Sequence, residues 1–196
     1  EHLPPGARVL VGGSTLAGEE EMLLEAVPSG VVTILAPRHP ERFGDVAQIL
    51  RRRGVPWVRR TEWVQSPAQL QPGSVFLLDS VGELASVYSL AEVAFVGGSL
   101  VPSGGHNPLE PAVLKCAVLA GPHTASAPTA YEAIFTAQGF GQVTSSTDIA
   151  REAARLLADP AAAATAGIAA AQGAATLSGA VDRSVIQLKQ LLDARA

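Results

Sequence analysis

Short apolar runs, rich in β-branched residues, alternate with stretches of helical periodicity along most of this chain. The runs predict seven strands, at residues 8–11, 31–36, 55–59, 74–79, 93–96, 117–120 and 141–144. Helical patterns fall between them, at residues 18–27, 40–53, 82–89, 108–114 and 129–138. Strands that alternate with helices form βαβ units with parallel pairing. The sequence therefore predicts an α/β fold, with a parallel sheet that helices cover on both faces.

Length and composition favour one domain. The chain has 196 residues, and 47% of them are hydrophobic, which is enough to bury a substantial core. We expect residues 1–196 to form a single domain that ends in an Ala-rich helical tail at 147–196. The tail pattern is interrupted at Asp159-Pro160, with further breaks near Gly173 and Ser178-Gly179. Because Met22 is the only methionine, we expect the chain to be a piece of a longer protein.

Charge and cysteine content exclude several classes of partner. The net charge of −4 gives no basic footprint for nucleic acid or for an anionic membrane surface. The single cysteine, Cys116, cannot form an internal disulfide, which fits a reducing, cytoplasmic setting. No apolar stretch approaches the roughly 18–20 residues that span a bilayer, so this piece is expected to be soluble.

The most informative segment runs from Val96 to Pro111 and is rich in glycine. It predicts a strand, then a glycine loop containing Gly104, Gly105 and His106, then a helix that begins near Asn107 and Pro108. Free amides at such a helix start can bind a phosphate, and glycine lets the ligand approach the backbone closely. An ordinary turn between a strand and a helix would fit the same spacing.

Within this segment, Glu110 follows Asn107 by three residues. Asn107 is a favourable N-cap, and a glutamate at the third helical position can complete a capping box. The same carboxylate could instead accept hydrogen bonds from ribose hydroxyls. Both roles remain open.

Two further clusters follow predicted strands and precede predicted helices, where ligands bind in open α/β sheets. In the first, Pro37, Arg38 and His39, the guanidinium could bind a phosphate. The alternative is that Arg38 pairs with a nearby surface acid.

The second cluster is Val81, Gly82 and Glu83, which could lie along a nucleobase. An ordinary helix start capped by Asp79 or Ser80 is the alternative.

Metal binding and serine catalysis are weakly indicated. Three of the four histidines, His39, His106 and His123, lie in predicted loops, but none has metal-ligand spacing. Gly97-Gly98-Ser99 is not a nucleophile elbow. We expect neither a metal nor a cofactor.

Four segments resemble the C-terminal domain of bacterial 3-deoxy-D-manno-octulosonic acid (Kdo) transferases. They are residues 37–43, the Gly82-Glu83-Leu84 step followed by Tyr88, residues 96–111, and Gly121-Pro122-His123. They occur in the family's order, and the long glycine-rich segment is the most specific. The resemblance implies a GT-B glycosyltransferase, in which two Rossmann-like domains face each other across a cleft.

The resemblance also implies the ligand and its contacts. The C-terminal domain of the family holds CMP-Kdo, the donor. Pro37 and Arg38 would contact CMP, Val81, Gly82 and Glu83 would lie along the nucleotide, and Asn107, Pro108, Leu109 and Glu110 would grip ribose and phosphate. His39, Gly104, Gly105 and His106 would support them.

The resemblance implies that the full-length enzyme transfers Kdo to the lipid A precursor at the cytoplasmic face of the bacterial inner membrane. The general base is a glutamate of the N-terminal domain, so we expect no catalytic residue in this chain and no activity from it alone. Nucleic acid is not an expected partner, and the membrane is expected to be met only through the full-length protein.

The sequence departs from the family pattern at two places. Leu16 stands where the family has histidine in a Ser-Thr-His-x-Gly-Glu-Glu step, and residues 124–128 replace a Phe-Asn-Phe-like step. An altered donor preference is therefore open. Two alternatives to the transferase are a non-catalytic nucleotide-binding module and a relative of the UDP-sugar 2-epimerases.

Overall fold

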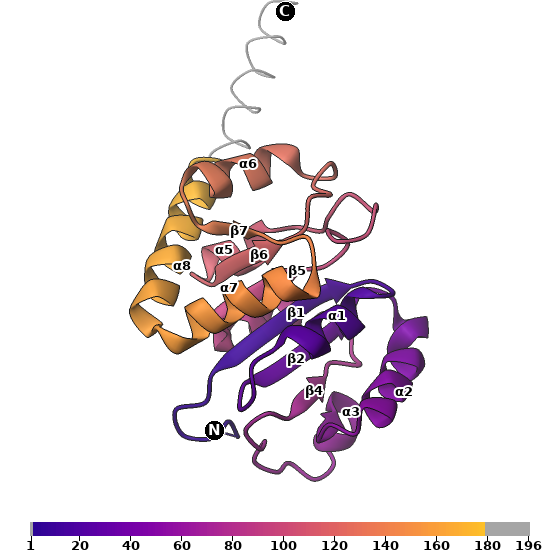
Figure 1. The fold of residues 1–196 in the computed structure, drawn as a ribbon. Coiled ribbons are helices and arrows are strands. Elements are labelled where there is room, and N and C mark those ends of the chain that lie inside the picture. The colour runs from indigo at the N-terminus through magenta and orange to yellow at the C-terminus, as the bar shows by residue number, and fades with distance from the viewer. Residues whose placement is uncertain (1, 179–196) are drawn as a thin grey trace, which may run out of the picture.

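The computed structural model describes residues 2–178, which contain a seven-stranded parallel sheet (Figure 1). Its strands are β1 (Val9–Thr15), β2 (Val32–Pro37), β3 (Trp57–Arg59), β4 (Val75–Leu77), β5 (Val93–Val96), β6 (Ala117–Ala120) and β7 (Phe140–Gln142). They lie in the order β3-β4-β2-β1-β5-β6-β7, and every neighbouring pair is parallel. The predicted α/β fold is confirmed.

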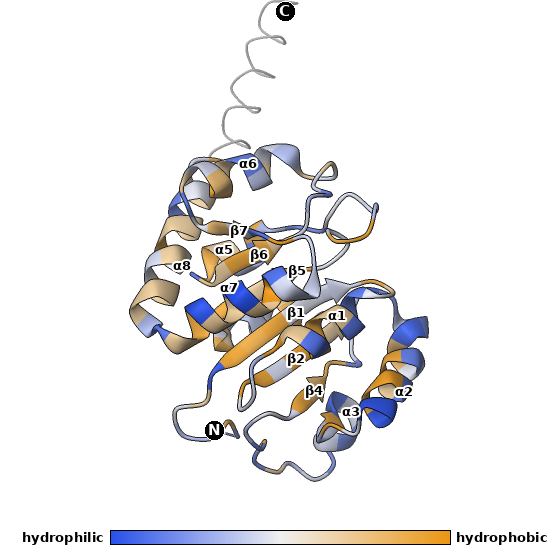
Figure 2. Ribbon diagram, viewed as in Figure 1, coloured by the Kyte–Doolittle hydropathy of each residue, from blue (hydrophilic) through white to orange (hydrophobic). Residues whose placement is uncertain are grey.

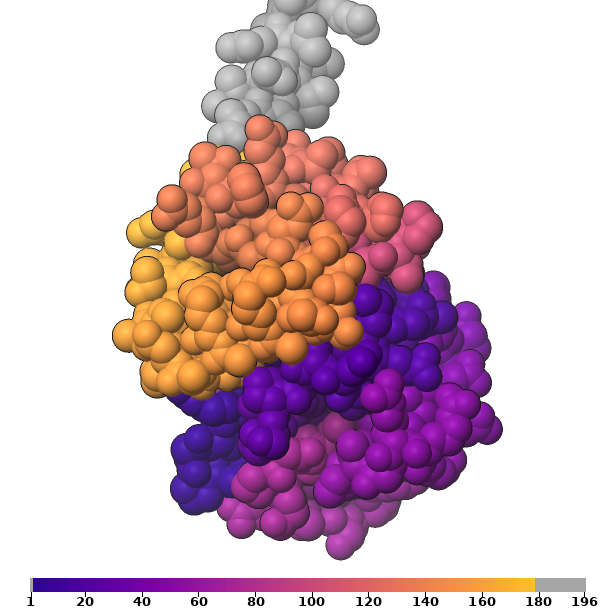
Figure 3. Space-filling model, viewed as in Figure 1, coloured from indigo at the N-terminus to yellow at the C-terminus, as the bar shows by residue number. Residues whose placement is uncertain are grey.

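The strand order reverses beside β1. The chain moves from β1 to β2 on one side and later crosses to β5 on the other side. Figure 3 shows the result at the surface, where the indigo and purple first half and the orange second half occupy separate regions. In open parallel sheets, ligands bind at the carboxyl ends of the strands where the order reverses. The loops after β1 and β5 flank that position.

Helices lie on both faces of the sheet. They are α1 (Glu19–Ala26), η1 (Pro40–Arg42), α2 (Phe43–Arg53), α3 (Arg60–Trp63), α4 (Leu84–Val87), η2 (Tyr88–Leu90), α5 (Leu109–Val113), α6 (Pro128–Thr136), α7 (Ser146–Ala158) and α8 (Pro160–Ala175). No helix among residues 2–178 is long and apolar enough to cross a membrane.

The core is divided between the two faces of the sheet. On one face, Leu23 of α1, Leu50 of α2 and Leu156 of α7 are buried in the cluster that contains Leu10 of β1 and Phe95 of β5. On the other, α5, α6 and α8 cover β5 and β6, while the short α4 and η2 lie over the β2–β4 side. Figure 2 shows orange strands in the sheet and blue positions on α1, α2 and α7, whereas the Ala-rich α8 is mostly pale orange.

Strand β1 extends beyond the predicted strand, which ended at residue 11, directly before two glycines. Gly12 and Gly13 resemble a loop in sequence, but here they are buried strand residues. A Cβ on Gly12 would lie 2.7 Å from the Leu23 side chain, and one on Gly13 would overlap the Tyr88 hydroxyl. Glycine at these positions lets neighbouring side chains pack directly against the strand.

Several predicted helices differ in extent. Residues 40–53 form a 3-10 turn followed by α2, and residues 84–90 likewise divide between α4 and η2. Helix α3 was not predicted. The predicted break near Gly173 is wrong, since α8 continues through it. The lack of a side chain at this position lets the helix pack closely on the backbone of Ala133 and Ile134. The interruption at Asp159-Pro160 is confirmed, whereas Gly179 and the tail beyond it lie outside the described residues.

Candidate functional site

The three predicted clusters follow β2, β4 and β5, so they lie at the same edge of the sheet. Two of them meet directly. Pro37 and Arg38 line a small pocket of about 80 Å³ together with Val81, Gly82 and Ser14. Ser14 has a φ of 54°, unusual for a residue with a side chain, and sits where the β1–β2 register shifts.

Arg38 is an exposed cation beside this pocket. Its backbone amide donates to the carbonyl of Thr15, 3.0 Å away, which fixes the residue against the end of β1. Within residues 2–178, no acidic group lies within ion-pair distance of its guanidinium. The alternative pairing with Glu41 or Asp45 is therefore wrong. The neighbouring His39 lies 4.0 Å from Glu41, and both side chains are exposed.

His106 lies close enough to Arg38 and His39 for them to affect its pKa. Burial, followed by the charges of Arg38 and His39, lowers the pKa of His106 below its ordinary value, and Glu110 partly opposes this shift. Its Nε2 atom is buried without a hydrogen-bond partner in the described part of the chain. The charge of the nearby Arg38 guanidinium thus disfavours protonation of His106.

Gly104 and Gly105 both have positive φ values, 88° and 73°. A Cβ on Gly104 would overlap the Ser126 side chain, and one on Gly105 would lie 2.6 Å from the carbonyl oxygen of His123. The sequence suggested that glycine makes room for a ligand. Here the close approach is made by the chain itself.

The helix that follows begins one residue later than predicted. Helix α5 has five residues, with Pro108 as its N-cap and no side-chain capping bond. Asn107 instead accepts a hydrogen bond from the Leu109 amide at 3.0 Å and donates to Glu110 at 3.3 Å. A helix this short has a weak dipole, because the macrodipole sums over aligned peptides. Anion binding here would depend on individual amide groups.

Of the three residues in the cluster after β4, Glu83 already uses its side chain in hydrogen bonds within the chain. Val81 is 79% exposed, and Gly82 has a φ of 90°. Glu83, however, accepts hydrogen bonds from the Ser80 hydroxyl and from Arg60, and the first of these contributes most to lowering the pKa of Glu83. Its carboxylate is thus already engaged by two side chains of the chain itself.

Asp79 and Ser80 do not cap α4. Asp79 accepts hydrogen bonds from the backbone and side chain of Thr61, in the first turn of α3, and Ser80 donates to Glu83. The expected capped start at this position is wrong. Asp79 instead caps the short helix after the neighbouring strand β3.

Glu19 is a residue whose role the sequence did not reveal. The sequence placed it only in the Gly-Glu-Glu part of the step that resembles the family, three residues after Leu16. It is completely buried and accepts backbone hydrogen bonds from Leu16, Gly98, Ser99 and Leu100, at 2.8 to 3.1 Å. Burial raises the pKa of Glu19, and the amides oppose that rise.

Glu20, its neighbour, forms a separate buried ion pair. Arg42 donates to both carboxylate oxygens, at 2.6 and 3.0 Å, and the Thr15 hydroxyl donates to one of them. The Glu20 side chain is 0% exposed and that of Arg42 is 15% exposed. This pair ties η1, directly after Arg38, to α1.

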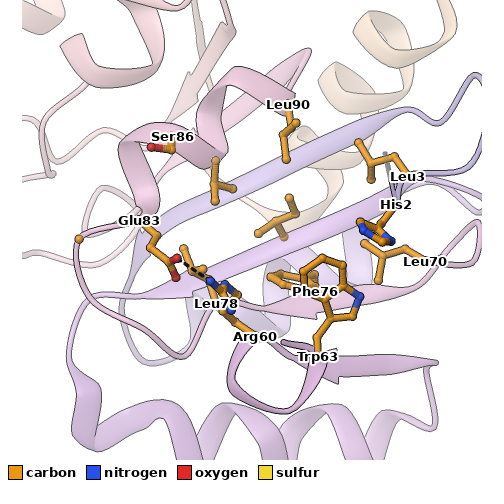
Figure 4. A pocket seen from close by; sticks show the side chains of 13 residues that line it. His2, Leu3, Arg60, Trp63, Leu70, Phe76, Leu78, Glu83, Ser86 and Leu90 are labelled. Carbon is orange, nitrogen blue, oxygen red and sulfur yellow. Dashed lines mark hydrogen bonds and ion pairs between the residues drawn. The ribbon is translucent and has the colours of Figure 1, made fainter. Parts of the chain in front are cut away.

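A larger cavity of about 340 Å³ lies on the β2–β4 side of the sheet (Figure 4). Its wall is mostly apolar and includes Trp63 and Phe76, and the Arg60–Glu83 ion pair lies along one side. It shares Leu78 and Gly82 with the small pocket beside Arg38. The two hollows are therefore neighbours, separated in part by these two residues.

The remaining acids, histidines and cysteine do not gather into a metal site. Among residues 2–178, no three His, Cys, Asp or Glu side chains are grouped so that they could hold an ion. Cys116 is buried and its Sγ lies 3.1 Å from the carbonyl oxygen of Tyr88.

Similarity to known sequences points to one group of enzymes. The 3-deoxy-D-manno-octulosonic acid transferase of Haemophilus influenzae is 37% identical over 155 residues, which cover 76% of this chain and 36% of that protein. The transferase of Bordetella pertussis is 36% identical over 132 residues, covering 61% of this chain and 29% of that protein. The chain thus spans about a third of the length of these curated relatives. No family model matches the sequence.

Solved structures give the corresponding domain. HepE of Anabaena, determined with UDP-glucose, superposes on this chain with a TM-score of 0.65 at 16% identity, covering 96% of this chain and 49% of HepE, which supports the fold alone. The C-terminal CMP-Kdo binding domain of WaaA from Acinetobacter baumannii has a TM-score of 0.78 and 33% identity. The match covers 86% of this chain and 89% of that domain. The chain has the fold of the C-terminal half of a GT-B glycosyltransferase, and it belongs to the family of the C-terminal domains of Kdo transferases.

Proposed function

We propose that this chain is the donor-binding domain of a Kdo transferase and binds CMP-Kdo at the edge formed by the loops after β1, β2, β4 and β5. The observation that carries the proposal is the unpaired Arg38 guanidinium at this edge, beside the pocket that Val81 and Gly82 complete. The 33% identity with a CMP-Kdo binding domain supports CMP-Kdo as the ligand.

The residues suit the parts of the nucleotide. Arg38 offers a forked, permanently charged donor to the phosphate. Asn107 and Glu110 supply an amide and a carboxylate for ribose hydroxyls, and both are exposed at the same loop. Val81, which is 79% exposed, provides apolar surface for the base. Pro37, Gly82, Pro108 and Leu109 shape the walls, and Glu83 contributes through its backbone, since its carboxylate already binds Arg60 and Ser80.

In the reaction, the bond between Kdo and the CMP phosphate breaks, and negative charge develops on the departing phosphate. Arg38 would stabilise this charge more strongly in the transition state than in the bound donor. The amides around Asn107 would add to this effect. Within residues 2–178, the backbone N–H of Asn107 donates to no group of the chain, so it is available to a ligand.

The acceptor side of the reaction belongs to the rest of the enzyme. We propose that a glutamate in the N-terminal domain removes the proton from the acceptor hydroxyl, and that the acceptor is the lipid A precursor. The site of action would be the cytoplasmic face of the inner membrane. Without that domain, this chain binds the donor and does not turn it over.

The decisive measurement is CMP binding to this chain by calorimetry, together with amide hydrogen exchange. We expect millimolar or tighter binding, with slower exchange at the amides of Asn107, Leu109 and Glu110. UMP and UDP serve as matched controls for base and phosphate preference. Joining the chain to an N-terminal domain of the family and assaying transfer from CMP-Kdo then tests catalysis.

Three results would contradict the proposal. Absence of binding and of protection at millimolar CMP would remove the donor site. Stronger binding of UDP than of CMP would favour an epimerase-like relative. If the joined protein binds CMP-Kdo but yields no product, the non-catalytic alternative would be supported instead.

A further inference from the structure

We propose that Glu19 is a positioning residue of the donor site and holds the glycine-rich segment in the conformation that binds the nucleotide. The inference rests on the proposed function. Its carboxylate accepts a hydrogen bond from the backbone amide of Leu16, after β1. It also accepts hydrogen bonds from the amides of three successive residues after β5, namely Gly98, Ser99 and Leu100. It therefore joins the two loops that flank the reversal of strand order.

The three successive amides would otherwise form an anion site. Consecutive backbone N–H groups that point into one concavity bind phosphates and carboxylates in many proteins. Here the concavity is filled from within by a completely buried carboxylate. The donor phosphate consequently cannot use these amides, and its contacts shift along the chain to Arg38 and to residues near Asn107.

The arrangement requires a carboxylate. Oε1 of Glu19 accepts from Ser99 and Leu100, and Oε2 accepts from Leu16 and Gly98, so each oxygen faces two donors. A glutamine has one acceptor oxygen and one donor NH₂ group. Whichever way its amide is turned, the NH₂ group faces two other donors and leaves them unsatisfied.

Hydrogen bonds connect the backbone at Gly97 and Gly98 to the residues that directly precede the candidate ligand contacts. The carbonyl of Gly97 accepts from the His106 amide at 3.0 Å, and that of Gly98 accepts from the Gly105 amide at 2.8 Å. A Cβ on Gly98 would lie 3.0 Å from the His106 ring, so backbone and imidazole are in close contact. Movement of peptides 97–98 therefore moves residues 105–106 and, directly after them, Asn107.

The first test is the Glu19→Gln variant. We expect its CMP dissociation constant to rise about tenfold or more, because a small misplacement of binding groups costs affinity steeply. Glu21→Gln is the matched control, since Glu21 lies on the same helix with its side chain 49% exposed. It should bind CMP as the unmodified protein does.

A second comparison separates positioning from stability. Leu50→Ala removes a fully buried side chain of α2, which lies outside the glycine-rich segment in sequence, and it supplies a destabilised reference. Affinities are compared where both variants are fully folded. If Leu50→Ala and Glu19→Gln lose affinity in proportion to lost stability, or if neither loses any, the positioning role is overturned.

Hydrogen exchange of the unmodified protein decides the matter even where Glu19→Gln does not fold. We expect the amides of Gly98, Ser99 and Leu100 to exchange slowly without CMP and to be unchanged by it, while residues 107–110 gain protection. Fast exchange at Gly98–Leu100 that slows only when CMP binds would overturn the inference. If CMP does not bind at all, the proposed function fails, and slow exchange at these amides would still show that Glu19 holds the loop.

Discussion

The side-chain amide of Asn107 donates to the carboxylate of Glu110, with Nδ2 and Oε1 3.3 Å apart. In a capping box the glutamate would instead reach back to a backbone amide. That contact is not made, and both side chains are exposed at the edge where Arg38 lies. A long contact between exposed side chains contributes little to folding, so Glu110 remains available to a ligand.

Glu110→Gln should therefore weaken CMP binding and leave the fold nearly unchanged. Loss of a charge-assisted hydrogen bond to ribose costs about 1.5–3 kcal/mol, which corresponds to roughly a tenfold or greater loss of affinity. An exposed substitution of this kind changes the free energy of unfolding by less than about 0.5 kcal/mol. Calorimetry with CMP and urea unfolding measure the two quantities. Unchanged affinity with a lower melting temperature would assign Glu110 to capping alone.

Arg38→Ala should lower CMP affinity most at low ionic strength. An exposed guanidinium that contacts a phosphate contributes through a screened charge, so added salt reduces the difference between variant and unmodified protein. Arg52→Ala is the control, since the Arg52 side chain is 72% exposed in α2 and lies 3.8 Å from Glu21. Equal losses in both variants would mean that the effect comes from net charge and not from a contact.

The sequence predicted the strands well and the helices less well. The run at residues 31–36 is apolar except for Thr33 and rich in β-branched residues, which predicts a buried strand, and β2 is buried along its whole length. Helix α3 was missed because its four residues form no periodic pattern. Its first turn is capped by Asp79, which lies eighteen positions after Thr61. The glycines of β1 escaped because their need for space comes from Leu23 and Tyr88, which sequence cannot place beside them.

The candidate site likewise contains residues that the sequence could predict and one that it could not. Arg38, Val81 and Gly82 could be predicted because each follows a strand, and parallel strands bring such positions to one edge. Glu19 could not be assigned, because its partners lie 79 to 81 positions later in the chain. The signal that was present is the place of Glu19 in the Gly-Glu-Glu part of the step that resembles the family.

Protonation of His106 should weaken the fold as the pH falls. Its pKa is lowered in the folded state, so the folded protein binds fewer protons than the unfolded chain below about pH 6.5, the ordinary value for histidine. The stability that neutral His106 contributes is present above that pH and is lost as the pH falls towards the folded-state pKa. Urea unfolding at pH 7.5 and 5.5 should show a smaller loss for His106→Gln than for the unmodified protein. Identical losses would show that His106 does not titrate differently on folding.

Arg42→Ala should destabilise the chain strongly. It leaves the fully buried Glu20 carboxylate with only the Thr15 hydroxyl, and removal of one partner of a buried ion pair costs about 3–5 kcal/mol. The exposed Arg52→Ala variant should cost less than about 1 kcal/mol. Denaturant unfolding compares them. A cost below 1 kcal/mol for Arg42→Ala would mean that Glu20 is solvated or protonated in the folded state.

Gly97→Ala and Gly44→Ala should change stability in opposite directions. A Cβ on Gly97 would overlap the carbonyl of Ser14, and because Gly97 also donates to Gly13 at 2.8 Å, the two loops cannot separate without breaking the β1–β5 contact. We expect a loss of about 1–3 kcal/mol, as for other overpacked sites. Gly44 lies in the first turn of α2 with open space where its Cβ would be, so alanine there should stabilise the helix by up to about 1 kcal/mol. Denaturant unfolding of both variants tests the contrast, and the same sign for both would mean that the close approach of the loops after β1 and β5 is not what requires glycine at position 97.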